Sequence, residues 1–283
     1  MYVRIIPRLD IKGPNLVKGI HLEGLRVLGK PEHFARYYYE TGADELLYVD
    51  AVASLYGRNS LLNIIQKTSK EIFVPLTVGG GLRSVDDIRT VLRSGADKVS
   101  INTAAIHRPE LIREAAKTFG SSTIVVSIEA IRRPDGFYEC YTDYGREKSG
   151  MDALHWALRA AELGAGELLV TSIDREGTGK GFDLELTRRI AESVPIPVIA
   201  SGGAGNIEHI RDVITHGSAD AVSVASILHY NYAKNEKYSD ADFSEEGNIE
   251  FLRQKRTIPS EIQGASVSEI KEDLVKHGIS CRT

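Results

Sequence analysis

Two acidic residues hold matched places in the chain and could move protons. Asp10 follows the apolar run at residues 3–6, and Glu129 follows the run at 124–128. Two carboxyls in unequal environments can act as general acid and general base, because burial and neighbouring charges separate their pKa values. Either one alone is more often an ordinary loop residue, so their matched placement is what favours chemistry. Lys18, in the polar loop after the first run, could supply a cation for a phosphate or for developing negative charge.

Glycine-rich turns and short polar segments follow four further apolar runs, and they suit phosphate. Glycine lets the backbone approach an anion closely, and a helix N-terminus presents unpaired N–H groups to it. One glycine pair is more often a tight turn, whereas two sets at one spacing predict two phosphate cups and an elongated ligand with a phosphate at each end. The first set is Gly80, Gly81, Asn102 and Thr103, and the second is Ser201, Gly202, Gly203, Ala225 and Ser226.

Four more polar residues could support these sites. Asp50 and Asp174 form a second matched acidic pair, and Thr171 and Glu176 lie in the same segment as Asp174. The eight histidines form no ligand cluster, and the sequence contains neither a nucleophile elbow nor a dinucleotide-binding fingerprint. We therefore expect neither a metal nor a cofactor.

Eight short β-branched runs must position these residues, with amphipathic segments between them. Near-continuous apolar strands that alternate with helices indicate a parallel sheet covered on both faces. Eight such units in about 250 residues is the size of a (β/α)8 TIM barrel, and a doubly wound sheet is the rival fold. The runs lie at residues 3–6, 45–49, 74–78, 98–101, 124–128, 167–171, 197–200 and 221–225.

An internal repeat favours the barrel. Gly80 aligns with Gly203 and Ala96 with Ala219, at an offset of 123 residues in both cases. The chain therefore reads as two copies of a half-barrel, forming a single α/β domain over residues 1–283 with two related sites on one face.

Residues 231–264, after the eighth strand, have no counterpart after the fourth, and we interpret them as an insertion. The insertion could be a lid, a partner contact or a solvated loop. The last helix is expected to begin at the capping box of Ser266 and Glu269.

Four charged residues begin strands, and their side chains could meet as a ring at the N-terminal mouth of a barrel. Without further context, the simplest interpretation is a salt-bridge plug that only stabilises the barrel floor. The four are Arg4, Glu45, Lys98 and Glu167.

The composition argues against several classes of partner. The 35 basic and 39 acidic side chains give a net charge of −4, so nothing favours nucleic acid. Two distant cysteines, Cys140 and Cys281, argue against a disulfide framework and for a reducing compartment. No apolar run has the length of a signal peptide or of a membrane-spanning helix, so we expect a cytoplasmic protein with no membrane partner.

Six motifs together resemble the cyclase subunit of imidazole glycerol phosphate synthase. The likeness extends from Arg4 to about His229 and returns in the final helix. The motifs are IIPxLDxK at 5–12, VKG at 17–19, TVGGG at 77–81, GADKVSIN at 95–102, TSIDRxGT at 171–178 and IASGGAG at 199–205.

This resemblance implies a reaction and a partner. A glutaminase docked on the N-terminal barrel face would supply ammonia. The barrel would condense it with a ribulosyl aminoimidazole carboxamide nucleotide bearing two phosphates, giving imidazole glycerol phosphate and the carboxamide ribotide. Asp10 and Glu129 would be the acid/base pair, and Lys18 would lie on a mobile active-site loop. The ring of four charged residues would be the gate through which ammonia enters.

The chain departs from the family pattern at a few positions. Glu129 and Glu176 stand where the family carries Asp, Arg8 replaces a Cys, and the family lacks the long insertion. One alternative is a paralogue that uses channelled ammonia to modify a nucleotide sugar or a surface-polysaccharide precursor. A second alternative is the sister isomerase of the same pathway, but the ring of four charged residues argues against it. A third is a non-catalytic platform that activates a glutaminase.

Overall fold

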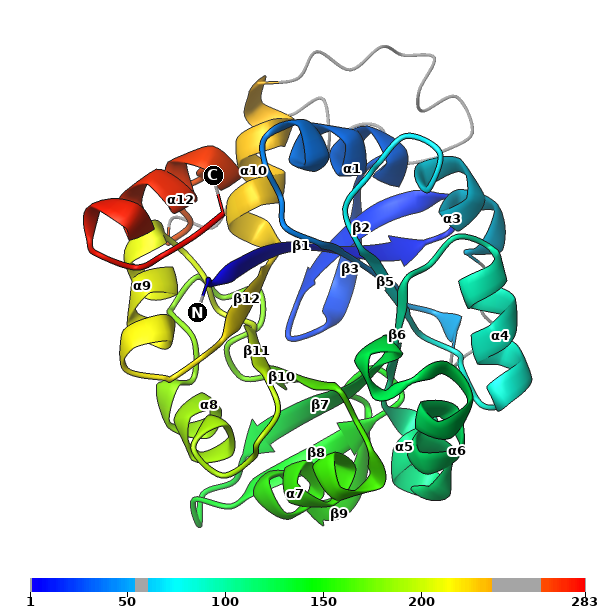
Figure 1. The fold of residues 1–283 in the computed structure, drawn as a ribbon. Coiled ribbons are helices and arrows are strands. Elements are labelled where there is room, and N and C mark those ends of the chain that lie inside the picture. The colour runs from blue at the N-terminus through cyan, green and yellow to red at the C-terminus, as the bar shows by residue number, and fades with distance from the viewer. Residues whose placement is uncertain (1, 54–60, 236–260, 283) are drawn as a thin grey trace.

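The computed structural model describes residues 2–53, 61–235 and 261–282. In these residues, eight parallel strands close into a barrel with helices around it (Figure 1). Hydrogen-bonded neighbours follow the order β10-β11-β12-β1-β4-β5-β6-β7, and pairing of β10 with β7 closes the ring. The prediction of a (β/α)8 barrel is confirmed. Its strands are β1 (Arg4–Lys12), β4 (Leu46–Asp50), β5 (Leu76–Gly79), β6 (Lys98–Ile101), β7 (Ile124–Arg132), β10 (Glu167–Ser172), β11 (Val198–Ser201) and β12 (Ala221–Val224).

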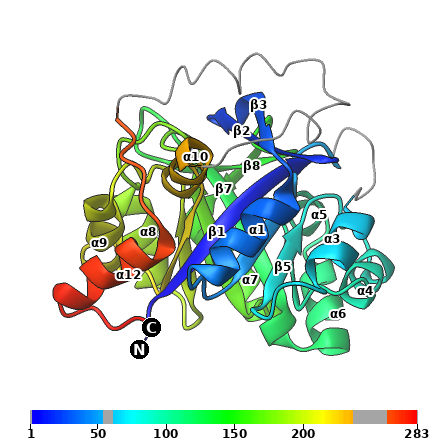
Figure 2. The same cartoon turned by 90° about the horizontal axis from the view of Figure 1, so that it is seen from above.

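Each half of the barrel carries an antiparallel hairpin that the sequence analysis missed. The segment interpreted as a polar loop after the first strand forms β2 (Asn15–Ile20) and β3 (Glu23–Gly29), and β7 is followed by β8 (Tyr138–Thr142) and β9 (Glu147–Asp152). The two residues of the β2–β3 turn both have positive φ, the geometry of a tight hairpin turn, and the longer β8–β9 turn has positive φ at Asp143, Tyr144 and Gly145. The β2–β3 hairpin lies at the end of the barrel away from the chain termini (Figure 2).

The hairpins lengthen the strands that carry the two acidic residues. β1 and β7 both span nine residues. Asp10 is paired with Val17 of β2, and Glu129 with Tyr141 of β8. The matched placement of the two carboxyls therefore corresponds to one structural position, the point where each hairpin joins the barrel.

Helices cover the outside of the barrel, and several begin at residues whose side chains cap them. Ser84, Asp152, Asp183 and Asn206 each accept a hydrogen bond from a backbone N–H in the first turn. The expected capping box at Ser266 is confirmed. The helices are α1 (Pro31–Glu40), α3 (Leu62–Thr68), α4 (Val85–Arg93), α5 (Thr103–His107), α6 (Glu110–Phe119), α7 (Ala153–Leu163), α8 (Leu184–Ala191), α9 (Ile207–Thr215), α10 (Ser226–Asn235) and α12 (Val267–Lys276).

Residue 231, where the insertion is expected to start, lies within α10. Residues 231–235 continue α10, because the Tyr232 ring packs against Phe34 and Tyr37 of α1, with centroid separations of 4.6 and 4.5 Å. Residues 236–260, the bulk of the expected insertion, lie outside the described residues.

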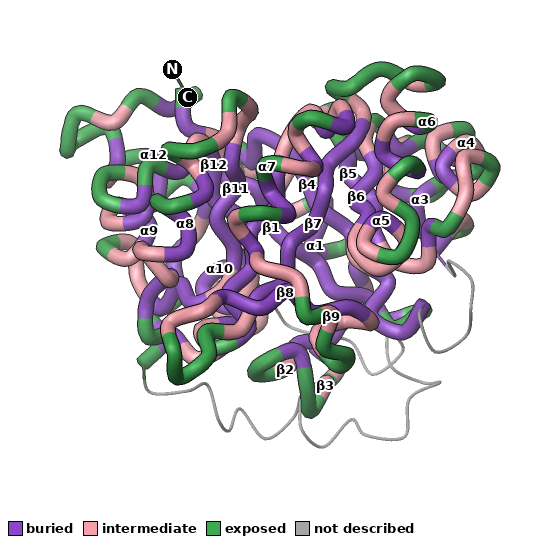
Figure 3. Tube along the Cα trace, turned by 90° about the horizontal axis from the view of Figure 1, so that it is seen from below, coloured by how far each residue is buried: buried purple, intermediate pink, exposed green. Residues whose placement is uncertain are grey.

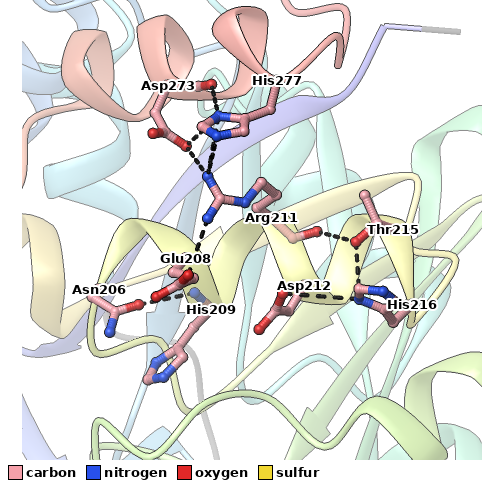
Figure 4. A network of polar contacts seen from close by, with 9 residues as sticks. All are labelled: Asn206, Glu208, His209, Arg211, Asp212, Thr215, His216, Asp273 and His277. Carbon is pink, nitrogen blue, oxygen red and sulfur yellow. Dashed lines mark hydrogen bonds and ion pairs between the residues drawn. The ribbon is translucent and has the colours of Figure 1, made fainter.

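The last helix, α12, is tied to its neighbour α9 by a polar network (Figure 4). One guanidinium nitrogen of Arg211 donates to Asp273 at 3.1 Å, and the other donates to Glu208 at 3.2 Å. The chain end returns beside the first strand, where the Val3 N–H donates to the Ser280 carbonyl at 2.9 Å.

Side chains inside the barrel form layers, because alternate residues of each strand face inward. Along β1 the inward series is Arg4, Ile6, Arg8 and Asp10, which runs from the N-terminal end to the C-terminal end. The barrel strands are buried almost throughout, whereas the β2–β3 hairpin is largely exposed near its tip, apart from the buried Leu22 (Figure 3). The middle layer is apolar and consists of Ile6, Leu47, Val125, Leu169, Ile199 and Ala221.

Candidate active site

Two cavities open at the C-terminal ends of the strands, and each holds one of the expected phosphate cups. The larger has a volume of about 310 Å³ and lies over β5, β6 and β7, whereas the smaller has about 20 Å³ and lies over β11 and β12. The larger cavity is lined by Gly80, Gly81, Asn102 and Thr103, and the smaller by Ser201, Gly202, Gly203, Ala225 and Ser226. β5 and β6 stand opposite β11 and β12 in the ring, so the cups face each other across one mouth.

The glycine turns of the two cups have the same local geometry. Gly80 corresponds to Gly202 rather than to Gly203, the residue that the sequence repeat aligned with it, because Gly80 and Gly202 have φ values of 92° and 89° whereas Gly203 has 116°. A Cβ at Gly80 would lie 2.6 Å from the Asp50 carbonyl oxygen, and one at Gly202 would lie 2.8 Å from that of Ser172. Each turn therefore needs glycine both for its backbone angle and for its close approach to the preceding strand.

In the larger cup, two side chains expected to bind phosphate are used within the protein. The Asn102 amide nitrogen donates to Glu129 Oε2 and to the Tyr141 carbonyl, both at 3.1 Å. The Thr103 hydroxyl accepts from the Asp143 N–H at 2.9 Å. Both residues thus hold the β8–β9 hairpin, which leaves their backbone N–H groups as the groups suited to an anion.

Glu129 is a buried carboxyl in the wall of the larger cavity. Burial raises its pKa to about 7; the Arg8 cation opposes this shift, and the charge of Asp10 adds to it. Asn102 and the Gly145 backbone N–H donate hydrogen bonds to this carboxyl. Glu129 therefore exchanges its proton close to neutral pH, the range in which a general acid is effective.

Asp10 is also buried, but its environment differs from that of Glu129. The Arg8 Nε donates to Asp10 Oδ1 at 2.9 Å, forming an ion pair shielded from water. Asp10 lines neither of the two cavities, whereas its partner Arg8 lines both. The two carboxyls thus lie in the unequal environments that acid/base work requires, one paired with a cation and the other with a neutral amide.

Lys18 lies on strand β2 rather than on an irregular loop. Its Nζ forms a buried ion pair with Glu176 and donates to the Gly19 carbonyl at 3.0 Å. The second Glu176 oxygen accepts from the Leu22 N–H at 3.2 Å. Glu176 lines the smaller cavity, so this ion pair connects the β2–β3 hairpin to the second cup.

The remaining expected residues divide between the mouth and the scaffold. Asp50 lines the larger cavity, and Thr171 is buried with its hydroxyl 3.4 Å from Arg8 Nη1. Asp174 is exposed and lines neither cavity, and its carboxylate accepts from the Arg132 N–H at 2.8 Å. Asp174 therefore anchors its loop to the end of β7.

Two residues at the mouth were missed as site residues in the sequence analysis. Arg8 was noted only as a departure from the family, and Tyr144 was not noted at all. Tyr144 lines the larger cavity, and burial, with the charge of Asp10, raises its pKa well above the ordinary value. The period-two alternation of β1 places Arg8 on the same face as Asp10 and could have identified it. Tyr144 had no such signal, because the hairpin that carries it was not predicted.

The four charged residues at the opposite end form a closed ring. Arg4 Nη1 lies 2.6 Å from Glu45 and 3.0 Å from Glu167. Lys98 Nζ lies 3.0 Å from Glu45 and 3.1 Å from Glu167. Each cation thus bridges both carboxylates, and the apolar middle layer separates this ring from the mouth.

The structure is a closed (β/α)8 barrel with a charged floor, an apolar middle layer and two facing cups at the C-terminal ends of its strands. This is the architecture of a small-molecule enzyme. Comparison with known proteins gives the family. The family model "Histidine biosynthesis protein" matches residues 4–234.

Two relatives narrow the assignment. A protein of Legionella pneumophila, "Imidazole glycerol phosphate synthase subunit HisF", is 60% identical over 209 residues, covering 74% of this chain and 99% of that relative. A protein of the same name from Alkaliphilus metalliredigens (strain QYMF) is 50% identical over 228 residues, covering 81% of this chain and 90% of that relative. The chain belongs to the histidine biosynthesis family and, within it, to the HisF subunits of imidazole glycerol phosphate synthase.

Proposed function

We propose that this chain is the ammonia-dependent cyclase of imidazole glycerol phosphate synthase. Membership of the HisF subunits makes it a lyase of histidine biosynthesis, and the sugar-modifying alternative is not favoured. The proposed substrate is the ribulosyl aminoimidazole carboxamide nucleotide, and the products are imidazole glycerol phosphate and the carboxamide ribotide. The single observation that best supports this substrate is the pair of cups facing each other across one mouth, which suits a phosphate at each end.

We assign to the two buried carboxyls the two proton transfers that accompany addition of ammonia to a carbonyl carbon. One proton must leave the attacking nitrogen, and one must reach the developing alkoxide. Asp10, held beside the Arg8 cation, suits the base, and Glu129, with a pKa of about 7, suits the acid. Lys18, beside the second cup, supplies positive charge near the phosphate there.

A partner subunit follows from the subunit names of the relatives. We assign a glutaminase to the N-terminal face, where the ring of Arg4, Glu45, Lys98 and Glu167 would admit ammonia to the barrel. Two exposed aromatic residues support a docking surface there, since Tyr2 precedes β1 and Phe73 precedes β5, with 62% and 77% of their surfaces exposed.

The test uses the purified chain with an ammonium salt and the ribulosyl nucleotide. Turnover is followed as loss of the substrate's ultraviolet absorbance. We expect turnover by the wild type and a loss of at least about 100-fold in kcat for Asp10→Asn, because a general acid or base contributes that much. The control, Asp135→Asn in the exposed segment between β7 and β8, should keep full activity. Failure of the wild type to consume the nucleotide would reject the proposed activity.

A further inference from the structure

Arg8 is the one residue that lines both cavities in the described part of the chain. It comes from the inward face of β1, between the apolar residue Ile6 and the carboxyl of Asp10. Its side chain therefore divides the mouth into a large and a small compartment. A ligand with one end in each cup must run past the Arg8 guanidinium.

The guanidinium is fixed in place by protein groups on one side. Nε donates to Asp10 at 2.9 Å, and Nη1 lies 3.4 Å from the Thr171 hydroxyl. A planar guanidinium carries five N–H donors in a rigid fork, and these two contacts use only part of that set. Because Arg8 lines both cavities, we assign its remaining donors to the space that a ligand would fill.

The surroundings keep Arg8 charged. Burial disfavours the cation, but the charge of Asp10, with the neighbouring acidic groups of Tyr144, Glu129 and Glu176, outweighs burial and raises the Arg8 pKa. A buried, charged donor forms stronger hydrogen bonds than a neutral one, and leaving its donors without acceptors is costly. The ligand group placed here must therefore carry acceptor oxygens rather than positive charge or bare hydrocarbon.

We propose that Arg8 is a substrate-binding, specificity-determining residue that donates hydrogen bonds to oxygens of the ribulosyl sugar between the two phosphates of the ligand. This inference rests on the proposed function, because the ribulosyl sugar and the two terminal phosphates belong to the substrate assigned there. Arg8 acts on the middle of the ligand, and the glycine turns act on its ends.

Binding of the ribulosyl nucleotide by calorimetry, without ammonia, tests this contact separately from turnover. Arg8→Met should weaken binding by about 10- to 100-fold, the loss expected for a charge-assisted hydrogen bond. Arg8→Lys keeps the charge beside Asp10 but removes the fork, and it should weaken binding by a smaller factor. Arg36→Met, at an exposed arginine of α1 paired with Glu40, is the matched control and should bind as the wild type does.

Inorganic phosphate is the second probe, because it occupies a cup without a sugar. Its affinity should stay unchanged in Arg8→Met, and an equal loss for phosphate and nucleotide would overturn the proposal by placing Arg8 on a phosphate. Wild-type affinity for the nucleotide in Arg8→Lys and in a folded Arg8→Met would also overturn it. If Arg8→Met does not fold, the nucleotide affinity of Arg8→Lys is the test.

If the wild type binds the nucleotide but does not convert it when ammonia is added, the proposed reaction fails while the Arg8 comparison stands. If the wild type does not bind the nucleotide at all, both proposals fall.

Discussion

At the scale of single residues, environment rather than residue type separates the two carboxyls. Asp10 and Glu129 occupy one structural position in the two half-barrels, at the first paired residue of each hairpin. Asp10 has an arginine as its partner, whereas Glu129 has the Asn102 amide and a backbone N–H. A charged partner favours the ionised form, and burial without one favours the protonated form.

The raised pKa of Glu129 makes the stability of the protein depend on pH. Below pH 4.5, the ordinary value, this carboxyl is protonated in both the folded and the unfolded chain. Between pH 4.5 and about 7 only the folded chain holds the proton, so stability decreases as the pH rises through this window. Relative to Glu129→Gln, the free energy of unfolding of the wild type should decrease by up to about 3 kcal/mol between pH 4.5 and pH 8.

Denaturant midpoints at the two pH values measure this effect. The exposed Glu162→Gln is the matched control and should follow the wild type at both pH values. If Glu129→Gln showed the same pH dependence as the wild type, Glu129 would have an ordinary pKa.

At the scale of elements, the two hairpins connect the barrel strands to the cups. The β2–β3 hairpin is held over the smaller cavity by the buried Lys18–Glu176 ion pair and by the His21 N–H, which donates to the Glu176 carbonyl at 3.0 Å. The β8–β9 hairpin is held over the larger cavity by Asn102 and Thr103. Each hairpin is thus fixed by polar side chains of the mouth, so its position and the geometry of the site depend on each other.

The Lys18–Glu176 pair should show strong coupling in a double-mutant cycle. Lys18→Met leaves a buried carboxylate without its cation and should cost about 3–5 kcal/mol of unfolding free energy. The double variant Lys18→Met/Glu176→Leu should lose less than Lys18→Met alone, because it leaves no unpaired buried charge.

The exposed Arg159–Glu162 pair is the reference cycle, with an expected coupling of about 0.2–1 kcal/mol. Urea unfolding of the four variants in each cycle gives the coupling energies. Additive losses for Lys18 and Glu176 would mean that the pair does not hold the hairpin.

At the scale of the whole molecule, the barrel has two polar ends separated by its apolar middle layer. The mouth carries the cups and the carboxyls, and the floor carries the charged ring. Among the described residues, no helix is long and apolar enough to cross a membrane. If ammonia enters at the floor, the ring must open, because each of its cations contacts both of its carboxylates.

Opening of the ring can be separated from the reaction at the mouth. Lys98→Ala removes two of the four contacts of the ring and lies far from the cups. With the glutaminase and glutamine, this variant should turn over about tenfold more slowly than the wild type, a barrier increase of about 1.4 kcal/mol, because a ring that cannot close lets ammonia escape to water. With free ammonium salt its rate should match the wild type, and equal losses with both nitrogen sources would argue against channelling.

The exposed aromatic residue Phe73 should contribute to docking of the glutaminase. Phe73→Ser should weaken the complex by about tenfold or more, because buried aromatic residues carry much of the energy of an interface. Ile20→Ser is the control, since Ile20 is 48% exposed on β2 at the other end of the barrel. Titration of the two subunits by calorimetry measures both affinities, and an equal effect of the two substitutions would place the partner elsewhere.

The sequence by itself determined the barrel, and its repeat pointed to the glycine turns and polar residues that line the two cavities. Strand patterns, glycine turns and repeated motifs are local signals, and a parallel barrel places the ends of all its strands at one mouth. Only the tertiary structure decided what the side chains at the mouth contact. It placed Lys18 against Glu176, 158 residues away in the chain, and Arg8 between the two cavities. Burial and ion pairing depend on residues that are distant in sequence, and those contacts set the charge of each group.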